Sequence, residues 1–276
     1  MSTRNRGLSS FAIAIYAFLF APIVVLVIFS FNDSRRTFVW HGFTLDWYPK
    51  LLANSDLLDS LQTTLIVAAV AVVVATILGS LLGLGLARLR FRGSGAAETL
   101  ILLPMVTPEI IMGISLLIFF THALSGVPAI GRISLAHITF CISYVAVVVR
   151  ARAVAMDPRL EEAARDLGAS AWGAFRYVTL PLILPAVLAG AMLAFALSFD
   201  DLVVTAFNTG PSATTLPVAI YSAIKFGVTP QINAISTIIV AVVAIALLIA
   251  WRSGAFGERD QRVVAEEPIE APGKPG

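Results

Sequence analysis

Two adjacent carboxylates, Asp200 and Asp201, lie inside a long run of apolar residues in the last third of the sequence. An aspartate at the centre of a membrane-spanning helix costs about 2.5–3.5 kcal/mol, so such a residue normally faces a polar cavity or a partner. The negative charge of the two side chains favours a cation as the species in that cavity. The alternative is that both aspartates end a helix near the membrane surface, where their carboxylates reach headgroup water.

The two aspartates are predicted to have different surroundings, because neighbouring residues on a helix point about 100° apart. Asp201 shares its helix face with three polar residues, whereas Asp200 lies on the face of Leu197 and Val204 and is expected to pair with a neighbouring helix. A kink between the two aspartates would remove this distinction. The predicted residues of the substrate path are Asp201, Asp200, Ser198, Thr205 and Asn208.

Other side chains that carry out catalysis are missing or isolated in this sequence. No GxxxxGK[ST] segment is present, so the chain lacks the loop and lysine that hold nucleotide phosphates. The one cysteine, Cys141, permits neither an intrachain disulfide nor a cysteine-rich metal site. His122 and His137 have no partner at metal-ligand spacing, and we expect a loop histidine and a buried, hydrogen-bonded one. The sequence therefore predicts no enzyme, no metal site and no cofactor bound by this chain.

A polar segment of residues 150–181 separates two apolar runs and is predicted to form a helical hairpin. Asp157 followed by Pro158 is a typical helix start, since the side chain accepts from free amides and the ring presets the backbone. Gly168 is suited to the left-handed conformation that ends a helix. Ser170 is suited to capping the helix that follows.

The first helix of the hairpin is predicted to be amphipathic. Glu161 and Arg165 are expected to pair along one side, and Pro181 is expected to end the hairpin. An apolar face rich in alanine lets another surface approach closely, which favours docking to a partner protein. The alternative is a hairpin that packs under its own helices or on the lipid surface. The residues of the apolar face, at helical spacing, are Leu160, Ala163, Ala164 and Leu167.

The remaining apolar runs have the length of membrane spans. The chain is 58% hydrophobic and 13% charged, and about twenty apolar residues cross a hydrocarbon core of about 30 Å. We expect an all-α integral membrane protein with six transmembrane helices, in which Gly79 and Gly83 allow close helix packing. The expected spans are Ser9–Phe31, Leu61–Ala87, Glu98–Leu124, Ile133–Val149, Leu182–Phe207 and Ile232–Trp251.

Basic residues are distributed unequally among the connections. With the N-terminus in the cytoplasm, the outer connections hold only five of the 19 lysines and arginines, and cytoplasmic segments are normally the ones enriched in them. We expect residues 1–8, the hairpin and a disordered tail of residues 252–276 in the cytoplasm, on either side of a transmembrane domain of residues 9–251. The net charge of +2 then reflects topology, and gives no reason to expect nucleic acid. The outer basic residues are Arg35, Arg36, Lys50, Arg132 and Lys225.

The hairpin also carries a specific motif. Glu162, Ala163 and Ala164 are followed by Gly168, and nine residues later by the segment VTLP at residues 178–181. This spacing resembles the EAA loop of ABC importer permeases of the binding-protein-dependent (MetI-like) type, with Val in place of Ile. The resemblance implies a type I permease fold whose hairpin precedes helix five and docks into a separate ATPase that binds the ATP. It assigns Glu162, Ala163, Ala164 and Gly168 to docking and turn positions.

Longer stretches extend the resemblance over nearly all of the chain as far as Trp251. The segments SFNDS at residues 30–34, AHITFC at 136–141 and SFDDLVV at 198–204 are similar to the polyamine permeases of the PotC and PotI kind. The resemblance implies a multi-pass protein of the cell inner membrane that forms half of a pathway for putrescine or spermidine. The partners that it implies are a second homologous permease subunit, an ATPase dimer and a substrate-binding protein.

Two other functions agree with part of the sequence. An ABC permease for another small organic solute would have the same hairpin and scaffold. A self-sufficient secondary transporter, driven by an ion gradient, usually shows internal repeats, and the two halves of this sequence show no convincing repeat. That function also leaves the EAA-like loop without a role. Dependence of transport on a co-expressed ATPase separates the permease from the secondary transporter.

Overall fold

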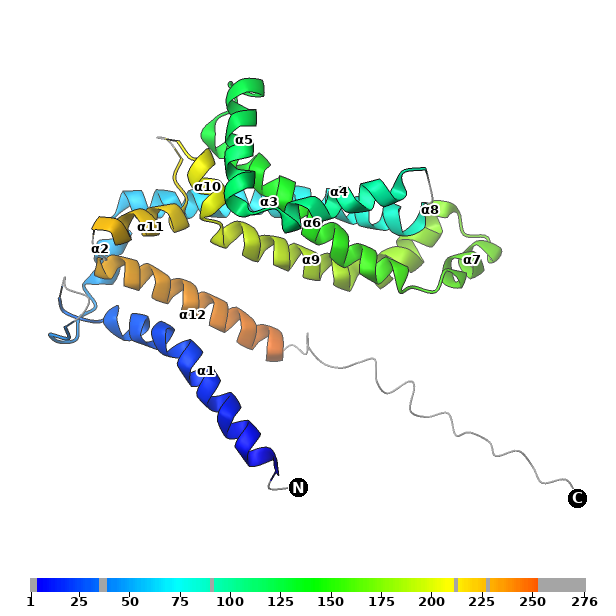
Figure 1. Cartoon of the computed structure of the whole chain (residues 1–276). Helices are drawn as coiled ribbons and strands as arrows, with labels where there is room; N and C mark the ends of the chain where they lie inside the picture. Colours follow the sequence, from blue (N-terminus) through cyan, green and yellow to red (C-terminus); the bar gives the residue numbers. More distant parts are fainter. Residues whose placement is uncertain (1–3, 35–38, 90–91, 211–212, 227–228, 253–276) are drawn as a thin grey trace, which may run out of the picture. The chain divides into compact units, whose positions relative to one another are not determined.

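The computed structural model describes residues 4–34, 39–89, 92–210, 213–226 and 229–252. All regular elements in these ranges are helices (Figure 1). Five helices are long and apolar enough to cross a membrane, and a pair bent by 106° makes a sixth span if it is counted as one. The described residues fall into two compact units, one within residues 1–51 and 229–276 and the other within residues 52–228.

The first unit contains the expected first and last spans. Helices α1 (Arg4–Phe29) and α12 (Pro230–Arg252) contact each other. The chain that follows α1 folds back on its end, where the indole nitrogen of Trp47 donates a hydrogen bond of 2.8 Å to the carbonyl of Asn32. Trp47 begins the short helix α2 (Trp47–Leu52), so this bond fixes the entry into α2.

The second unit is built on three long helices that contact one another: α3 (Ser55–Arg88), α6 (Ala129–Val154) and α9 (Leu180–Asp200) (Figure 1). Glycines on α3 let α6 approach closely. A Cβ atom on Gly79 would lie 2.7 Å from the Cβ of Val145, and one on Gly83 would lie 2.4 Å from the carbonyl oxygen of Ala146. The predicted packing role of this glycine pair is therefore confirmed.

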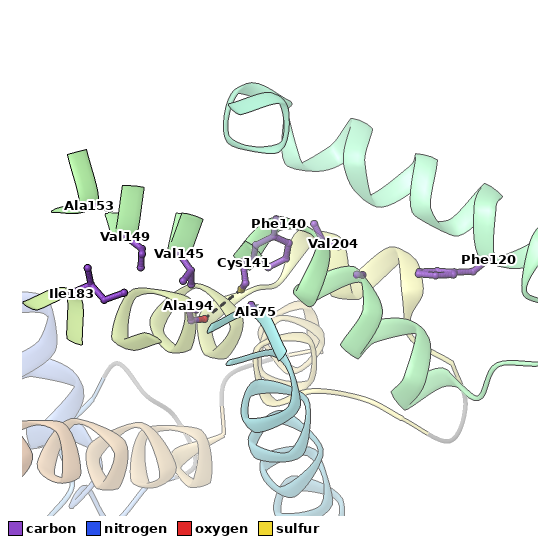
Figure 2. Packing of buried hydrophobic residues seen from close by; sticks show 11 residues of the cluster. Ala75, Phe120, Phe140, Cys141, Val145, Val149, Ala153, Ile183, Ala194 and Val204 are labelled. Atoms are coloured by element: carbon purple, nitrogen blue, oxygen red, sulfur yellow. Dashed lines mark hydrogen bonds between the residues drawn. The ribbon is translucent and has the colours of Figure 1, made fainter. Parts of the chain in front are cut away.

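Small and branched apolar side chains fill the interface between α6 and α9. Val145 and Val149 of α6 point towards Ile183 and Ala194 of α9 in Figure 2. Cys141 is fully buried in the same cluster, and its thiol donates to the carbonyl of Ala194 at 3.6 Å. The cysteine thus has the packing role that its place in an apolar run predicts.

The expected third span is two helices rather than one. Helix α4 (Ser94–Val106) ends before Thr107, and α5 (Glu109–Ala123) turns away from it by 106° (Figure 1). Thr107 has an extended backbone with ψ of 130°. A residue before proline is disfavoured in the helical region, so Pro108 accounts for the break.

The expected fifth span is also interrupted. Helix α9 ends at Asp200, Asp201 has an extended backbone with ψ of 120°, and a new short helix, α10 (Val203–Asn208), begins two residues later. The prediction of one continuous helix over Leu182–Phe207 was therefore wrong. The interruption lies at the two aspartates, so the face of a straight helix no longer determines where their side chains point.

The hairpin is formed by α7 (Arg159–Asp166) and α8 (Ala171–Ala174). A π-helical turn, η1 (Phe175–Thr179), joins α8 directly to α9, so residues 171–200 form one candidate span. Pro181 does not end the hairpin, contrary to the prediction. Proline is tolerated in the first turn of a helix, and a π turn shifts the backbone pairing just before it. After α10, helix α11 (Leu216–Phe226) is tied to α3, because the amide of Leu216 donates to Thr64 Oγ1 at 2.7 Å.

Candidate functional site

The two helix breaks of the second unit line one pocket of about 560 Å³. Thr107 and Pro108 come from the break between α4 and α5, and Asp200 and Asp201 come from the break between α9 and α10. Broken helices expose free backbone groups, which membrane proteins tolerate where the backbone is buried in protein or borders a cavity. The polar groups at the two helix breaks therefore border a cavity.

Three carboxylates line this pocket. Asp200 and Asp201 are joined by Glu109, the first residue of α5. Glu109 was not among the predicted site residues, although it lies directly after Pro108 in an apolar run, which is the same signal that identified the aspartates. Tyr144 and Phe140 of α6 add aromatic rings to the lining. The described lining residues include no lysine or arginine, so the carboxylates have no basic neighbour in the wall.

Asp200, rather than the polar stripe, faces the pocket together with Leu197 and Val204. The grouping of these three residues on one face was predicted, but Asp200 was expected to pair with a neighbouring helix, and the face of Asp201 was expected to line the path. Asp200 is exposed and makes no hydrogen bond or ion pair with any described residue. The Asp200 carboxylate is therefore not held by donors of the described chain, and the residue lines the pocket.

The three polar residues that were expected beside Asp201 point into the protein instead. Ser198, Thr205 and Asn208 are buried, and the Asn208 side chain donates to the carbonyls of Val204 and Gly113. The predicted orientation of these three residues towards the path is thereby corrected. Ser198 and Thr205 meet His137 of α6, and Asn208 meets the Gly113 carbonyl of α5.

Asp201 lies between the two environments. Its side chain is only 7% exposed, yet it contributes to the pocket wall. Its carboxylate accepts the backbone amides of Val204 at 3.3 Å and Thr205 at 2.7 Å. These are free donors in the first turn of α10, and an aspartate just before a helix commonly satisfies them. Asp201 thus acts as the cap of α10 as well as part of the wall.

The hairpin at the other end of α9 has the caps that the sequence predicts. Asp157 Oδ1 accepts the amide of Arg159, and Ser170 Oγ accepts the amide of Gly173. Gly168 has a φ of +87°, and its amide and that of Ala169 bond back to Arg165 and Ala164. This pair of hydrogen bonds is the Schellman motif, which ends a helix at a left-handed glycine.

The apolar face of α7 is left uncovered by the rest of the second unit. Leu167 is 90% exposed, and Leu160 is 46% exposed. Among the motif residues, Glu162, Ala163 and Gly168 are exposed and Ala164 is half-buried. A Cβ atom on Gly168 would meet nothing within 4 Å. The apolar side of α7 is thus exposed in this unit, while its Glu161 side contacts the long helices.

Glu161 connects the hairpin to the long helices. Its carboxylate accepts Arg88 at the end of α3 and Thr179 in the π turn before α9. The expected pair with Arg165 does not form, because both oxygens of Glu161 are directed towards these two donors. Glu161 therefore links α7 to the end of α3 and to the π turn that precedes α9.

Similar proteins of known name are found over most of the chain. The putrescine transport system permease protein PotI of Escherichia coli K12 is 43% identical over 252 residues, which is 89% of this chain and 90% of that protein. The spermidine/putrescine transport system permease protein PotC of the same strain is 45% identical over 242 residues, with 87% and 90% covered. A PotC homolog of Mycoplasma pneumoniae is 29% identical, with 87% of each chain covered.

Solved structures share the fold. A bacterial ABC transporter involved in the import of the acidic polysaccharide alginate superposes with a TM-score of 0.70, at 19% identity, over 93% of this chain and 97% of that one. An amino acid ABC transporter, solved with histidines, gives a TM-score of 0.54 at 21% identity over 76% of this chain. The helices described above therefore have the arrangement of an ABC transporter permease.

A family profile agrees with both comparisons. The family described as binding-protein-dependent transport system inner membrane component matches residues 75–259, a range that contains the hairpin, both aspartates and α6. Proteins of this family are multi-pass membrane components of transporters and not enzymes. The chain therefore belongs to the family of binding-protein-dependent transport system inner membrane components.

Proposed function

We propose that this chain is a permease subunit of an ATP-driven importer of polyamines and forms half of the translocation pathway. The single observation that carries the proposal is the pocket in which two helix breaks bring together Asp200, Asp201 and Glu109. The similarity to putrescine and spermidine permeases supports the same substrate class.

The composition of the pocket wall favours an organic cation over a metal ion. Its described wall has three carboxylates, two aromatic rings and no basic residue. Within the described part of the chain, no group of three or more His, Cys, Asp or Glu side chains is arranged to hold a metal. Several carboxylates suit a molecule that carries more than one ammonium group, and aromatic rings attract ammonium groups as well.

The hairpin is the part of the chain that is proposed to contact an ATPase partner. Its exposed apolar face, with Glu162, Ala163, Ala164 and Gly168 at the motif positions, is the proposed docking surface for one subunit of an ATPase dimer. ATP is bound and hydrolysed by that partner, because this sequence has no phosphate-binding loop. A second homologous permease and a substrate-binding protein complete the proposed importer. The hairpin and both termini are assigned to the cytoplasm by the distribution of basic residues.

Uptake measurements test this function directly. Cells that lack the chain, and have no other polyamine uptake, receive it on a plasmid together with its ATPase, and labelled putrescine and spermidine are supplied separately. We expect uptake of at least one polyamine to return. If the chain is in the membrane beside its ATPase and neither is taken up, the substrate is another organic solute. Uptake that persists without any ATPase would instead indicate a secondary transporter.

A further inference from the structure

His137 is buried at the centre of the second unit and has no role in the proposed function as described so far. It lies on α6 with only 1% of its surface exposed, and its ring contacts that of Phe140 at a centroid distance of 5.3 Å. Both ring nitrogens have partners on the opposite segment. Nδ1 lies 2.7 Å from Ser198 Oγ of α9, and Nε2 lies 2.9 Å from Thr205 Oγ1 of α10.

The direction of these hydrogen bonds follows from the neighbouring carboxylate. Thr205 Oγ1 donates its single hydrogen to Asp201 Oδ2 at 2.7 Å. Its oxygen therefore accepts from His137, which places a hydrogen on Nε2. The same Nε2 lies 3.3 Å from Asp201 Oδ2, so the aspartate adds to its attraction. The hydroxyl of Ser198, buried with Nδ1 as its neighbour, donates to that nitrogen, because a buried donor without an acceptor is costly.

The ring thus joins the two sides of the helix break. Ser198 is the last buried residue of α9 before the break, and Thr205 is in the first turn of α10. Asp201 lies between them, and the atoms close to its carboxylate belong to Val204, Thr205 and His137. With both ends held by one ring, the turn at residues 201–202 has little freedom to rotate. Asp200 ends α9 directly before this turn, and Asp201 lies in the turn itself, so the turn sets where Asp201 stands in the pocket wall.

We propose that His137 is a positioning residue for the cation path, one that holds the α9–α10 break so that Asp201 stays in the pocket wall next to Asp200. This inference rests on the proposed function of the pocket, but its structural part does not. His137 does not line the pocket itself, so it acts on the substrate only through the two aspartates. The simpler alternative is a histidine that fills space between α6 and α9.

Three substitutions separate positioning from packing. In His137→Gln the amide nitrogen reaches the position of Nε2 and still donates to Thr205 and Asp201. In His137→Asn the amide oxygen reaches the position of Nδ1 and still accepts from Ser198, but the donor to Asp201 is lost. His137→Leu replaces the imidazole by an apolar side chain and loses both hydrogen bonds. All three are quantified in the membrane, and uptake is expressed per amount of inserted chain.

The positioning role predicts that KM for polyamine uptake rises about tenfold in His137→Asn and His137→Leu, the change that accompanies loss of one buried hydrogen bond of about 1.4 kcal/mol. His137→Gln is expected to remain within about threefold of the unchanged chain, since it keeps the bond that fixes Asp201. Equal KM values in all four chains, or a loss in His137→Gln as large as in His137→Leu, would overturn the proposal.

A second measurement works without any substrate. Leu202 lies in the break and lines the pocket, and the single native cysteine is buried. A Leu202→Cys chain in a Cys141→Ala background reports on the break through its rate of reaction with a water-soluble maleimide. We expect His137→Leu to change this rate several-fold and His137→Gln to leave it unchanged. Identical rates would refute the positioning role, whereas absent polyamine uptake by the unmodified chain would refute only the proposed function.

Discussion

At the scale of single side chains, the neighbouring carboxylates of Asp200 and Asp201 have different surroundings. Asp201 accepts hydrogen bonds from the first turn of α10 and lies beside His137, whereas the carboxylate of Asp200 makes no such bonds with described residues and lines the pocket. A carboxylate that is already bound to the chain's own donors has less of its charge available for a ligand. Asp200 is therefore the stronger candidate for direct contact with a transported cation.

Substitution of Asp200 by Asn tests this assignment. The change removes one negative charge from the pocket wall and nearly preserves the volume of the side chain. We expect polyamine uptake at low substrate concentration to fall by about tenfold or more, because hydrogen bonds to charged groups contribute about 1.5–3 kcal/mol. Asp59→Asn is the matched control, since Asp59 is an exposed aspartate of α3 outside the pocket wall. Unchanged uptake by Asp200→Asn would remove Asp200 from the path.

At the scale of elements, glycine determines how helices meet and how they end. Gly83 lies against α6, where a Cβ atom would come within 2.4 Å of the Ala146 carbonyl oxygen. Gly85 lies on the same helix with nothing within 4 Å of a Cβ atom. The two positions therefore offer the same substitution in a crowded and in an open place.

We expect Gly83→Ala to lower the thermal stability of the purified protein and Gly85→Ala to preserve or raise it. Alanine is favoured over glycine in a helix by about 1 kcal/mol, but overpacking costs about 1–3 kcal/mol. The difference in unfolding temperature in the same detergent measures the contribution of close packing between α3 and α6. An equal change in unfolding temperature at both positions would show that α6 moves to accommodate the added methyl group without a loss of stability.

The hairpin turn offers a second test at this scale. Gly168 has a φ of +87°, a conformation that Asn and Asp adopt more readily than other side chains. Gly168→Asp therefore preserves the turn but adds a charge to the proposed docking surface. We expect the variant to insert normally, to lose coupled uptake and to leave ATP hydrolysis by the complex uncoupled from transport. Gly168→Asn is the uncharged control, and equal coupled uptake by both variants would argue against the docking role.

Much of this arrangement was predictable from local sequence. Apolar runs identified four spans that are single helices, and Asp157, Gly168 and Ser170 ended or began helices as their chemistry predicts. The two helix breaks were not placed correctly, although Pro108 is a visible cause of one. The residues at the Asp201 break contact a histidine 64 residues earlier in the chain, and periodicity along one helix contains no information about such a partner.

The same limit explains the error over the polar stripe. Ser198, Thr205 and Asn208 were assigned to the substrate path because polar residues in an apolar run normally face a cavity. In the structure their partners are protein groups, namely His137 and the carbonyls of Val204 and Gly113. A buried hydroxyl or amide group that donates to the protein interior has the same sequence signature as one that faces water.

At the scale of the whole molecule, the proposed direction of transport depends on how the chain crosses the membrane. The hairpin and Lys50 are expected on opposite sides, because most basic residues lie in the segments assigned to the cytoplasm. Lys50 is a well-exposed residue of α2, and Arg165 is an exposed residue of α7. The chain also has one cysteine, which is buried. These three facts allow the orientation to be measured by thiol labelling.

In intact cells, a membrane-impermeant maleimide is expected to label Lys50→Cys, in a Cys141→Ala background, and to leave Arg165→Cys unlabelled. After permeabilisation of the inner membrane, both positions should react. The Cys141→Ala chain without a new cysteine is the control for background. Labelling of Arg165→Cys in intact cells would reverse the orientation, and the hairpin would then be unable to meet an ATPase in the cytoplasm.

The π turn that joins α8 to α9 has a geometric consequence. Residues 171–200 form one helical rod, about 45 Å long at 1.5 Å per residue. A rod transmits twist as well as displacement, so its far end is fixed in phase with the hairpin. One inserted alanine between Thr179 and Ser198 would rotate that end by about 100° and carry Ser198 away from His137. The number of residues in this helix is thus as constrained as their identity, whereas the turn at Gly168 can absorb a change in length.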